Sequence, residues 1–459
     1  MRKTGIKLIA LLFVLASLGG CNLPASSAVK PTTAAPQPAS TQVVQKPAIT
    51  PMATATTTVA PETVTTQPTQ ALATATATTQ PTLAPALASA TAVPLSGPAI
   101  QLNQVHMLPG GAGWGWATRN GTMNWLLRTT DGGLSWSDAS PVGDYVYAGS
   151  YFLTDQNAWL STYNASTNTG GLLRTQDGGK TWEALPPNDI LQNAMFEFQS
   201  PSVGLAETAD MGAGNAYLKY YQTQDGGLTW QVVPLVAPSP EPSLPTGTIH
   251  LCNICGDSLY FDGSQTLITY GDMASDPAGS VRFSLSNDLG QHWKDFKLAL
   301  PAAYATGAVM PLMPAFFGTQ GFLPVSVIKF NADGTPEFSI LLTYTSQDAG
   351  QTWQVAPGVL KNMPSHVDTV QIISAQQAYV RCGGDLCVTT DASQTWTTLP
   401  KSLNFDMNAD EQAYVSQIRF ADSSNGYAIS GPSNNPSLWK TSDGGQTWVQ
   451  LSPILLEKQ

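Results

Sequence analysis

The sequence is poor in positive charge and lacks the short motifs that mark common enzyme sites. Lys and Arg contribute 20 of the 459 residues, against 31 Asp and Glu, so the formal net charge is −11. Such a chain repels phosphate backbones and anionic headgroups, so we expect neither nucleic acid nor a bare anionic membrane as a partner. Gly-x-Ser-x-Gly, His-Glu-x-x-His and phosphate-loop patterns do not occur.

Long hydrophobic runs are also missing. The apolar run Leu8–Leu18 follows three basic residues and is too short to span a bilayer as a mature helix. It ends in Leu18-Gly19-Gly20-Cys21, which resembles a bacterial lipobox. The pattern predicts a lipoprotein signal peptide over residues 1–20, lipidation of Cys21, and a lipid anchor in a cell membrane on its extracytoplasmic side. An ordinary secretory signal with a chance cysteine is the alternative.

Aromatic residues are absent from the next stretch. Residues 22–97 are rich in Thr, Ala and Pro, and Lys30, Lys46 and Glu62 are their only charged residues. This composition cannot bury enough apolar surface to offset the entropy lost on folding. We therefore predict a lipid-anchored, disordered linker over residues 21–97 and a folded domain over residues 98–459.

One pattern recurs seven times in the domain. A Ser or Thr stands two residues before an Asp, a Gly stands two residues after it in six copies, and a Trp stands five residues after it. Ser393 replaces the glycine in the sixth copy. The aspartates of this turn motif are Asp131, Asp177, Asp225, Asp288, Asp348, Asp391 and Asp443, and the tryptophans are Trp136, Trp182, Trp230, Trp293, Trp353, Trp396 and Trp448.

The motif predicts a turn between two strands. The carboxylate can accept hydrogen bonds from backbone N–H groups that follow it, and glycine supplies the positive φ of a tight connection. The tryptophan then begins the next strand and packs its ring between neighbouring sheets. We interpret the aspartates as structural, because one turn acid per unit does not supply the paired, differently tuned carboxylates that acid/base hydrolysis uses.

From Gln101 onwards the motif resembles the Asp-box, or BNR, repeat of β-propellers. A second pattern, Phe followed by a short polar turn and then Gly or an aromatic residue, starts at Phe152, Phe198, Phe317 and Phe420. It resembles the photosystem II stability and assembly factor family, which implies a seven-bladed, non-enzymatic propeller. Asp-box propellers also include sialidases and xyloglucanases, so the resemblance is specific for fold rather than function.

The spacing of the motif fits one four-stranded blade per repeat. Successive aspartates are 43 to 63 residues apart, and no sustained helical periodicity occurs. We therefore predict an all-β fold, a seven-bladed β-propeller of four-stranded antiparallel blades. In the sixth unit the expected strands are residues 369–374, 378–382, 386–389 and 395–399, with the motif between the third and the fourth.

Longer connections lie on the face opposite the motifs, where we expect a protein partner to bind. Tolerated surface insertions are the alternative. The long segments are Val232–Cys255, Gly271–Val281, Lys329–Phe338, Glu207–Ala216 and Lys401–Gln412. The acids on them are Glu207, Asp210, Asp272, Asp276, Asp333 and Glu337, which could attract a cationic partner.

Cysteine is scarce. Besides Cys21, the chain has Cys252, Cys255, Cys382 and Cys387, and their spacing favours two local disulfides. The segment His250-Leu-Cys252-Asn-Ile-Cys255 resembles a metal or redox site, but the sequence offers no further metal ligand nearby. Dense Asp spacing is missing too, so we predict no metal and no cofactor.

These observations predict an exported, membrane-anchored propeller that is a non-catalytic binding or assembly scaffold for a protein partner. Its arginines are few, and no Arg-Ile-Pro element precedes the repeats, which disfavours a sialidase. The alternative is a cell-surface propeller that binds or hydrolyses glycans, and a carboxylate pair among exposed aromatic residues would favour it.

Overall fold

The computed structural model describes residues 96–456, apart from 144, 165–168, 193, 213–214, 239–242, 253–257, 262–264, 271–278, 365–366, 368–369, 406–414 and 433. The chain divides into residues 1–88 and 89–459. The predicted signal peptide, the lipidation site Cys21 and most of the predicted linker lie outside the described residues. Among those residues, no helix has the length and apolar composition needed to cross a bilayer.

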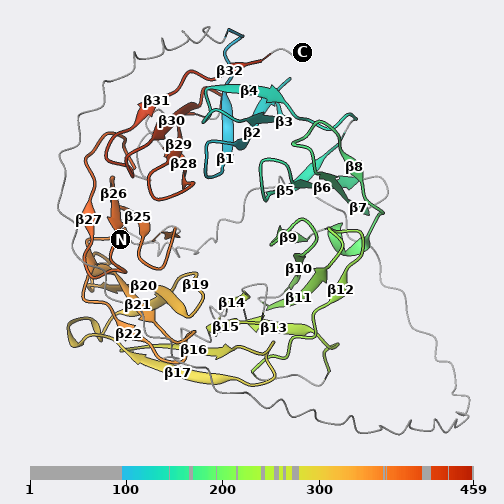
Figure 1. The fold of residues 1–459 in the computed structure, drawn as a ribbon. Helices are drawn as coiled ribbons and strands as arrows, with labels where there is room; N and C mark the ends of the chain where they lie inside the picture. The colour runs from blue at the N-terminus through green and yellow to red at the C-terminus, as the bar shows by residue number, and fades with distance from the viewer. Residues whose placement is uncertain are drawn as a thin grey trace, which may run out of the picture. The chain divides into compact units, whose positions relative to one another are not determined.

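Seven sheets form a ring, so the predicted all-β, seven-bladed propeller is confirmed (Figure 1). Each blade is built from consecutive strands, to which the end of the chain adds one strand in the first blade, and the first strand of a blade lies nearest the centre of the ring. Blade 1 has β1 (Leu102–Met107), β2 (Gly113–Arg119), β3 (Thr122–Thr129) and β4 (Ser135–Asp138). Blade 2 has β5 (Tyr147–Phe152), β6 (Ala158–Asn164), β7 (Thr169–Thr175) and β8 (Glu183–Ala184). Blade 3 has β9 (Met195–Phe198), β10 (Gly204–Gly212), β11 (Asn215–Thr223), β12 (Gln231–Val232) and β13 (Thr248–Cys252).

The remaining blades are built in the same way. Blade 4 has β14 (Ser258–Phe261), β15 (Leu267–Tyr270), β16 (Ser280–Ser286) and β17 (Lys294–Ala299); blade 5 has β18 (Ala308–Pro311), β19 (Ala315–Phe317), β20 (Gln320–Phe330), β21 (Pro336–Ser346), β22 (Gln354–Val355) and β23 (Leu360–Lys361). Blade 6 has β24 (Gln371–Ile372), β25 (Ala378–Cys382), β26 (Asp385–Thr389) and β27 (Thr397–Thr398); blade 7 has β28 (Val415–Phe420), β29 (Gly426–Ser430), β30 (Ser437–Thr441) and β31 (Val449–Gln450). Among the described residues, the short 3₁₀ helices η1 (Asp189–Gln192) and η3 (Ala302–Tyr304) lie in connections.

The end of the chain closes the ring on blade 1. Strand β32 (Ile454–Leu455) pairs in parallel with β4 and adds a fifth strand to the outer edge of that blade. The backbone N–H of Leu455 donates to the carbonyl of Pro98 at 2.8 Å, so the start of the domain lies against its end. On the inner side, the Gln417 amide donates to the carbonyl of Val105 and accepts from its N–H. Both edges of the contact between blades 7 and 1 are therefore tied by hydrogen bonds.

The seven turn motifs share one hydrogen-bond network. In each, the Asp carboxylate accepts from the Ser or Thr two residues earlier at 2.7–2.9 Å and from the backbone N–H four residues later at 2.8–3.0 Å. The side chain four residues later donates to the second carboxylate oxygen. These bonds lower the pKa of Asp288, Asp348 and Asp443 to about 2, because they stabilise the ionised form.

The motif turn also hydrogen-bonds to the turn between the first two strands of its own blade. The N–H after each Asp donates to a carbonyl in the connection between the first two strands, at 2.7–3.1 Å in all seven blades. Two consecutive residues in the turn have positive φ, and in the sixth copy these are Ala392 and Ser393. Buried Ser393 hydrogen-bonds to Thr343 of blade 5 at 2.9 Å, which accounts for a residue other than glycine there.

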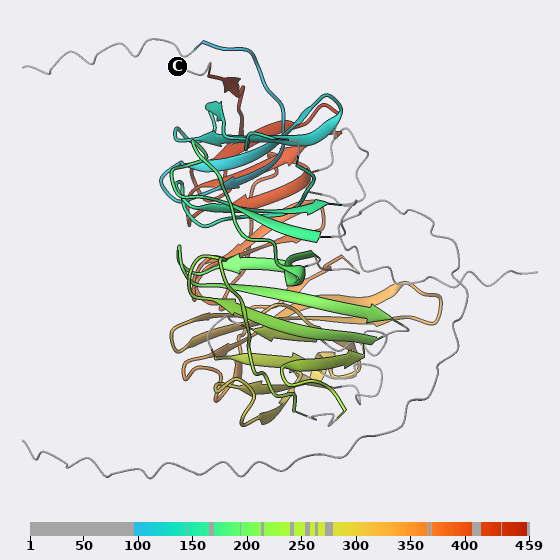
Figure 2. The same cartoon turned by 90° about the vertical axis from the view of Figure 1, so that its right-hand side faces the viewer.

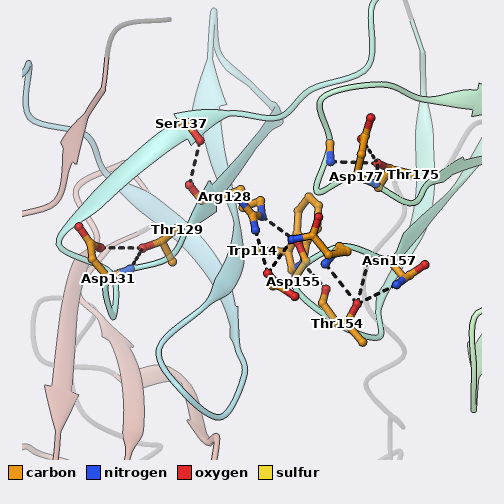
Figure 3. Close-up of polar contacts among 12 residues, drawn as sticks. Trp114, Arg128, Thr129, Asp131, Ser137, Thr154, Asp155, Asn157, Thr175 and Asp177 are labelled. Atoms are coloured by element: carbon orange, nitrogen blue, oxygen red, sulfur yellow. Dashed lines mark hydrogen bonds and ion pairs between the residues drawn. The ribbon is translucent and has the colours of Figure 1, made fainter. Parts of the chain in front are cut away.

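Adjacent blades are joined by aromatic stacking and by arginine. Trp159 of β6 stacks on Phe198 of β9 with ring centroids 3.7 Å apart, and Tyr379 of β25 stacks on Phe420 of β28 at 3.6 Å. Arg128, which directly precedes the first motif, donates to the backbone and the carboxylate of Asp155 in blade 2 (Figure 3). At Phe152, Phe198 and Phe420 the repeated Phe pattern therefore marks a blade interface, whereas Phe317 is exposed.

Three segments predicted as long loops contain paired strand instead. Residues Glu207–Gly212 pair with Asn215–Tyr220 in an extended β10–β11 hairpin, and residues up to Phe330 pair in the β20–β21 hairpin. In the Val232–Cys255 segment, β13 pairs with the first half of β11, from Asn215 to Lys219. Figure 2 shows the two hairpins, green and orange, extending beyond the ring on the same side. In an extended hairpin the backbone N–H and C=O groups of the extra residues form hydrogen bonds between the two strands, whereas in a free loop they would bond to water. The Gly271–Val281 and Lys401–Gln412 segments lie mostly outside the described residues.

Candidate functional site

The inner strands of four blades carry polar residues beside the centre of the ring. In β1, β5, β9 and β28 the last residue is buried, and the residue before it lies on the other face of its sheet. These penultimate residues are His106, Tyr151, Glu197 and Arg419, which we call the axial cluster. They come from blades 1, 2, 3 and 7, whose inner strands surround the same centre (Figure 1).

Electrostatic interactions show that the cluster is shared between blades. The charge of Arg419 acts on His106 and on Tyr151, and Tyr151 also feels the charge of Glu197. Burial, aided by Arg419, lowers the pKa of His106 to about 4. Burial and Glu197 raise the pKa of Tyr151, against the effects of Arg419 and a hydrogen bond from the Phe198 backbone. At neutral pH the imidazole and the phenol are therefore both uncharged.

A pocket of about 450 Å³ opens between blades 3 and 4, next to the axial cluster. We call it the Glu pocket. It is lined by Met195, Phe196, Glu197, Leu205, Glu207, Tyr220, Leu259, Tyr260, Phe261 and Met313. Aromatic side chains come from both blades, and the Tyr220 and Phe261 rings meet edge to face at 5.3 Å. Glu197 belongs both to this pocket and to the axial cluster.

The two carboxylates of the pocket lie on one face of blade 3. Glu197 pairs with Leu205, and Glu207 is two residues further along β10, where it pairs with Met195. Directly opposed residues share a face, and diagonal neighbours on that face have Cβ atoms about 7 Å apart. Glu207 and Tyr220 are also opposite each other on β10 and β11. The register therefore places Glu197, Glu207 and the Tyr220 phenol together.

The environments of the two acids differ. Burial raises the pKa of Glu207, although a hydrogen bond from Tyr220 partly offsets this by stabilising the carboxylate. Burial and the adjacent Glu207 also raise the pKa of Tyr220, so its phenol stays a donor. Glu197, by contrast, is exposed. One protonatable acid and one solvated acid on the same face is the arrangement that divides acid and base roles.

The residues singled out from the sequence lie mostly elsewhere. The motif aspartates face their own turns, and a disulfide joins Cys382 to Cys387. Cys255 lies outside the described residues, so its predicted bond to Cys252 does too. His250 is on the outer strand β13, where its ring stacks on Tyr217 at 4.9 Å. Among the described residues, no group of three or more His, Cys, Asp or Glu is arranged to hold a metal.

The acids predicted on long connections separate into three groups. Glu207 lies in the Glu pocket, whereas Asp210 is exposed further along the same strand. Asp333 and Glu337 lie at the tip of the β20–β21 hairpin, where Glu337 pairs with Lys329 at 2.6 Å. Asp272 and Asp276 lie outside the described residues.

Sequence reasoning missed the whole axial cluster, although a signal for it was present. Tyr151, Glu197 and Arg419 each directly precede a phenylalanine of the repeated Phe pattern. Because that phenylalanine is buried against the preceding blade, the residue before it must lie on the opposite face of the inner strand. Comparing this one position across the repeats would have found three of the four residues.

No family model and no curated protein matches the chain. Among solved structures, it is similar to a GH74 xyloglucanase from Xanthomonas campestris, with 13% identity and a TM-score of 0.44 over 77% of this chain and 54% of that one. The β-propeller domain of the Trilobed protease from Pyrococcus furiosus has 8% identity and a TM-score of 0.43, over 78% of this chain and 98% of that one. A PL25 ulvan lyase, a polysaccharide lyase bound to -[GlcA(1-4)Rha3S]-, has 10% identity and a TM-score of 0.43, over 77% and 96%. The chain spans about half the length of the xyloglucanase, and the likeness at these identities concerns the fold alone.

The prediction of a non-catalytic scaffold for a protein partner is wrong, and so is the prediction that the chain is not an enzyme. The solved structures similar to it include glycoside hydrolases and a polysaccharide lyase. The prediction considered one acid per repeat, held in a turn, and took no account of acids on strands near the axis. Glu197 and Glu207 supply the carboxylate pair that the turn motif lacks.

Proposed function

We propose that this propeller is a glycoside hydrolase whose active site is the Glu pocket. The observation that carries the proposal is the carboxylate pair on one face of blade 3, set among aromatic side chains in a 450 Å³ pocket. A Cβ separation of about 7 Å allows the two carboxyl groups to reach the separations of about 5 to 10 Å that glycosidases use.

The two acids have distinct roles in this proposal. Glu207, whose pKa burial raises, is the general acid that protonates the glycosidic oxygen as the bond to the anomeric carbon breaks. Exposed Glu197 is the ionised carboxylate on the other side of that bond, as the base for water or as the nucleophile. The Tyr220 phenol holds Glu207 in place through their hydrogen bond.

The pocket walls suit a sugar ring. The Tyr220 and Phe261 rings, one from each blade, lie on the faces that meet at the pocket, whereas the Phe196 and Tyr260 rings pack on the opposite faces of their sheets. Sugar rings carry apolar C–H faces that pack on aromatic rings, while the hydroxyl groups take the polar groups at the edge. Exposed Met195 and Met313 extend the apolar wall, and Met313 is 60% exposed.

The test is cleavage of a panel of polysaccharides, measured as new reducing ends, by the wild type, E207Q, E197Q and E183Q. Glu183 is the control, because it lies on the outer strand β8 and pairs with Arg174 at 2.7 Å. We expect E207Q and E197Q each to lose at least about 100-fold in kcat at unchanged melting temperature, and E183Q to keep full activity. A wild type that cleaves no member of the panel, or an E207Q variant of full activity, would overturn the proposal.

We also propose that the enzyme is displayed outside the cytoplasm on a lipid attached to Cys21. Support comes from the lipobox-like Leu18-Gly19-Gly20-Cys21 and from the Cys382–Cys387 disulfide, a bond typical of oxidising compartments. The Asp-box resemblance of the turn motif is consistent with an exported propeller. Expression with radiolabelled palmitate should label the wild type and leave C21S unlabelled. Labelling of C21S, or an unlabelled wild type, would contradict the anchor.

A further inference from the structure

The axial cluster contains a positive charge that the proposed hydrolysis does not use. Arg419 is accessible and is the penultimate residue of β28, while Glu197 and Glu207 are on blade 3. No ion pair joins Arg419 to a carboxylate among the residues that the structure describes. Its immediate electrostatic neighbours are His106 and Tyr151, which are uncharged at neutral pH. The positive charge is therefore not neutralised by these neighbours, in a chain whose net charge is −11.

Arg419 also borders a second pocket. A space of about 480 Å³ between blades 6 and 7 is lined by residues that include Gln371, Tyr379, Arg381, Gln417 and Arg419. None of the described residues lining it is Asp or Glu. We call this space the Arg pocket. Gln371 and Gln417 already hydrogen-bond to the backbones of Phe420 and Val105. The Arg419 guanidinium, in a lining without a carboxylate, is therefore the group suited to an anion.

Resting on the proposed hydrolase function, we propose that Arg419 binds an anionic group of the substrate, so that the substrate is an acidic polysaccharide. The anion is a carboxylate or a sulfate ester carried by a sugar unit near the cleaved bond. A guanidinium presents paired N–H donors that match two oxygens of either group. The neutral imidazole of His106 and the phenol of Tyr151 can add hydrogen bonds without adding a charge.

The position of Arg419 gives it a role in specificity rather than in bond cleavage. Glu197 and Arg419 act on Tyr151 from different blades, so one saccharide chain crossing the axis can place a sugar in the Glu pocket and an acidic group at Arg419. The anion is expected to be excluded from the Glu pocket, because the ionised carboxylate of Glu197 there repels it. Arg419 would therefore set the register of the substrate on the enzyme.

The test measures binding in the cleavage-deficient E207Q background, so that the ligand stays intact. Three oligosaccharides of equal length are compared by calorimetry: an oligouronate, a sulfated galactan fragment and a neutral β-glucan fragment. We expect one charged oligosaccharide to bind, and the neutral one to bind at least tenfold more weakly. Adding R419Q should weaken binding of that charged ligand roughly 10- to 100-fold. R419K should recover part of the loss, because lysine keeps the positive charge but lacks the paired N–H donors of the guanidinium.

The matched control is K180Q, which removes one positive charge from the exposed Lys180 of a turn motif. It should leave binding unchanged, and circular dichroism should show that all variants fold. Unchanged binding in R419Q, or equal binding of the neutral and charged ligands, would overturn the inference. If the wild type binds an acidic ligand through Arg419 but cleaves nothing, the proposed hydrolysis fails while the anion site stands. If a neutral glycan is cleaved and R419Q has no effect, the proposed hydrolysis stands while the anion site fails.

Discussion

Replacing Gly290 with alanine should destabilise the contact between blades 3 and 4 far more than backbone strain alone explains. Gly290 is the second positive-φ residue of the fourth turn motif, at +81°. A Cβ built on it would lie 2.0 Å from the carbonyl oxygen of Val236, in the connection between β12 and β13 of blade 3. Real Cβ atoms do not approach a backbone oxygen so closely, so one of the two segments must move by about 1 Å.

The expected magnitude follows from three contributions. An alanine in the left-handed region costs about 1–2 kcal/mol. Moving Val236 weakens the hydrogen bond from the Trp293 indole to its carbonyl, which is 3.1 Å long, and such a bond contributes about 1 kcal/mol. Overpacking of a close contact adds about 1–3 kcal/mol. We therefore expect G290A to lower the free energy of unfolding by about 4 kcal/mol.

Gly334 provides a matched control, because it has nearly the same backbone conformation without the contact. Its φ is +84°, and a Cβ built there would have nothing within 4 Å. G334A should therefore lose only the backbone contribution, about 1–2 kcal/mol. Guanidinium unfolding followed by tryptophan fluorescence compares the two variants with the wild type. If G290A is no less stable than G334A, the close approach of the turn to the preceding blade is not a determinant of stability.

Two further predictions concern pH. The turn aspartates Asp288, Asp348 and Asp443 have pKa values of about 2 in the folded protein, below the value of about 3.9 in an unfolded chain. Their contribution to stability is therefore complete above pH 4 and is lost as the pH falls towards 2. The melting temperature of the wild type should fall across that window, and D443N should show a smaller fall; identical slopes would refute this origin of acid lability. In the proposed hydrolase, cleavage needs Glu207 protonated, so kcat/KM should decline on the alkaline side at a pH above the ordinary glutamate pKa, because burial raises the pKa of Glu207. An alkaline limb at the ordinary glutamate value would remove Glu207 from the acid role.

Local chemistry alone was enough to predict the repeating parts of this protein. The Ser or Thr, the Asp and the glycine of each motif interact within eight residues of sequence, so their spacing predicts the turn without knowledge of anything distant. Seven such turns at blade-sized intervals then predict the number of sheets. The second and third strands of blade 6 follow closely from the pattern, since β25 spans Ala378–Cys382 as predicted and β26 begins one residue earlier.

Only the tertiary structure decided where the candidate chemistry lies. Glu197 and Glu207 become neighbours because β9 pairs with β10 in one register, and a shift by one residue would send them to opposite faces. His106, Tyr151 and Arg419 are separated by up to hundreds of residues and meet because ring closure places blades 7, 1 and 2 side by side. The sequence determined the repeat through interactions within each turn, whereas the site depends on contacts between repeats. The position directly before the repeated phenylalanine is shared by Tyr151, Glu197 and Arg419, but a different type of side chain stands there in each blade, so the chemistry of the site does not repeat in the sequence.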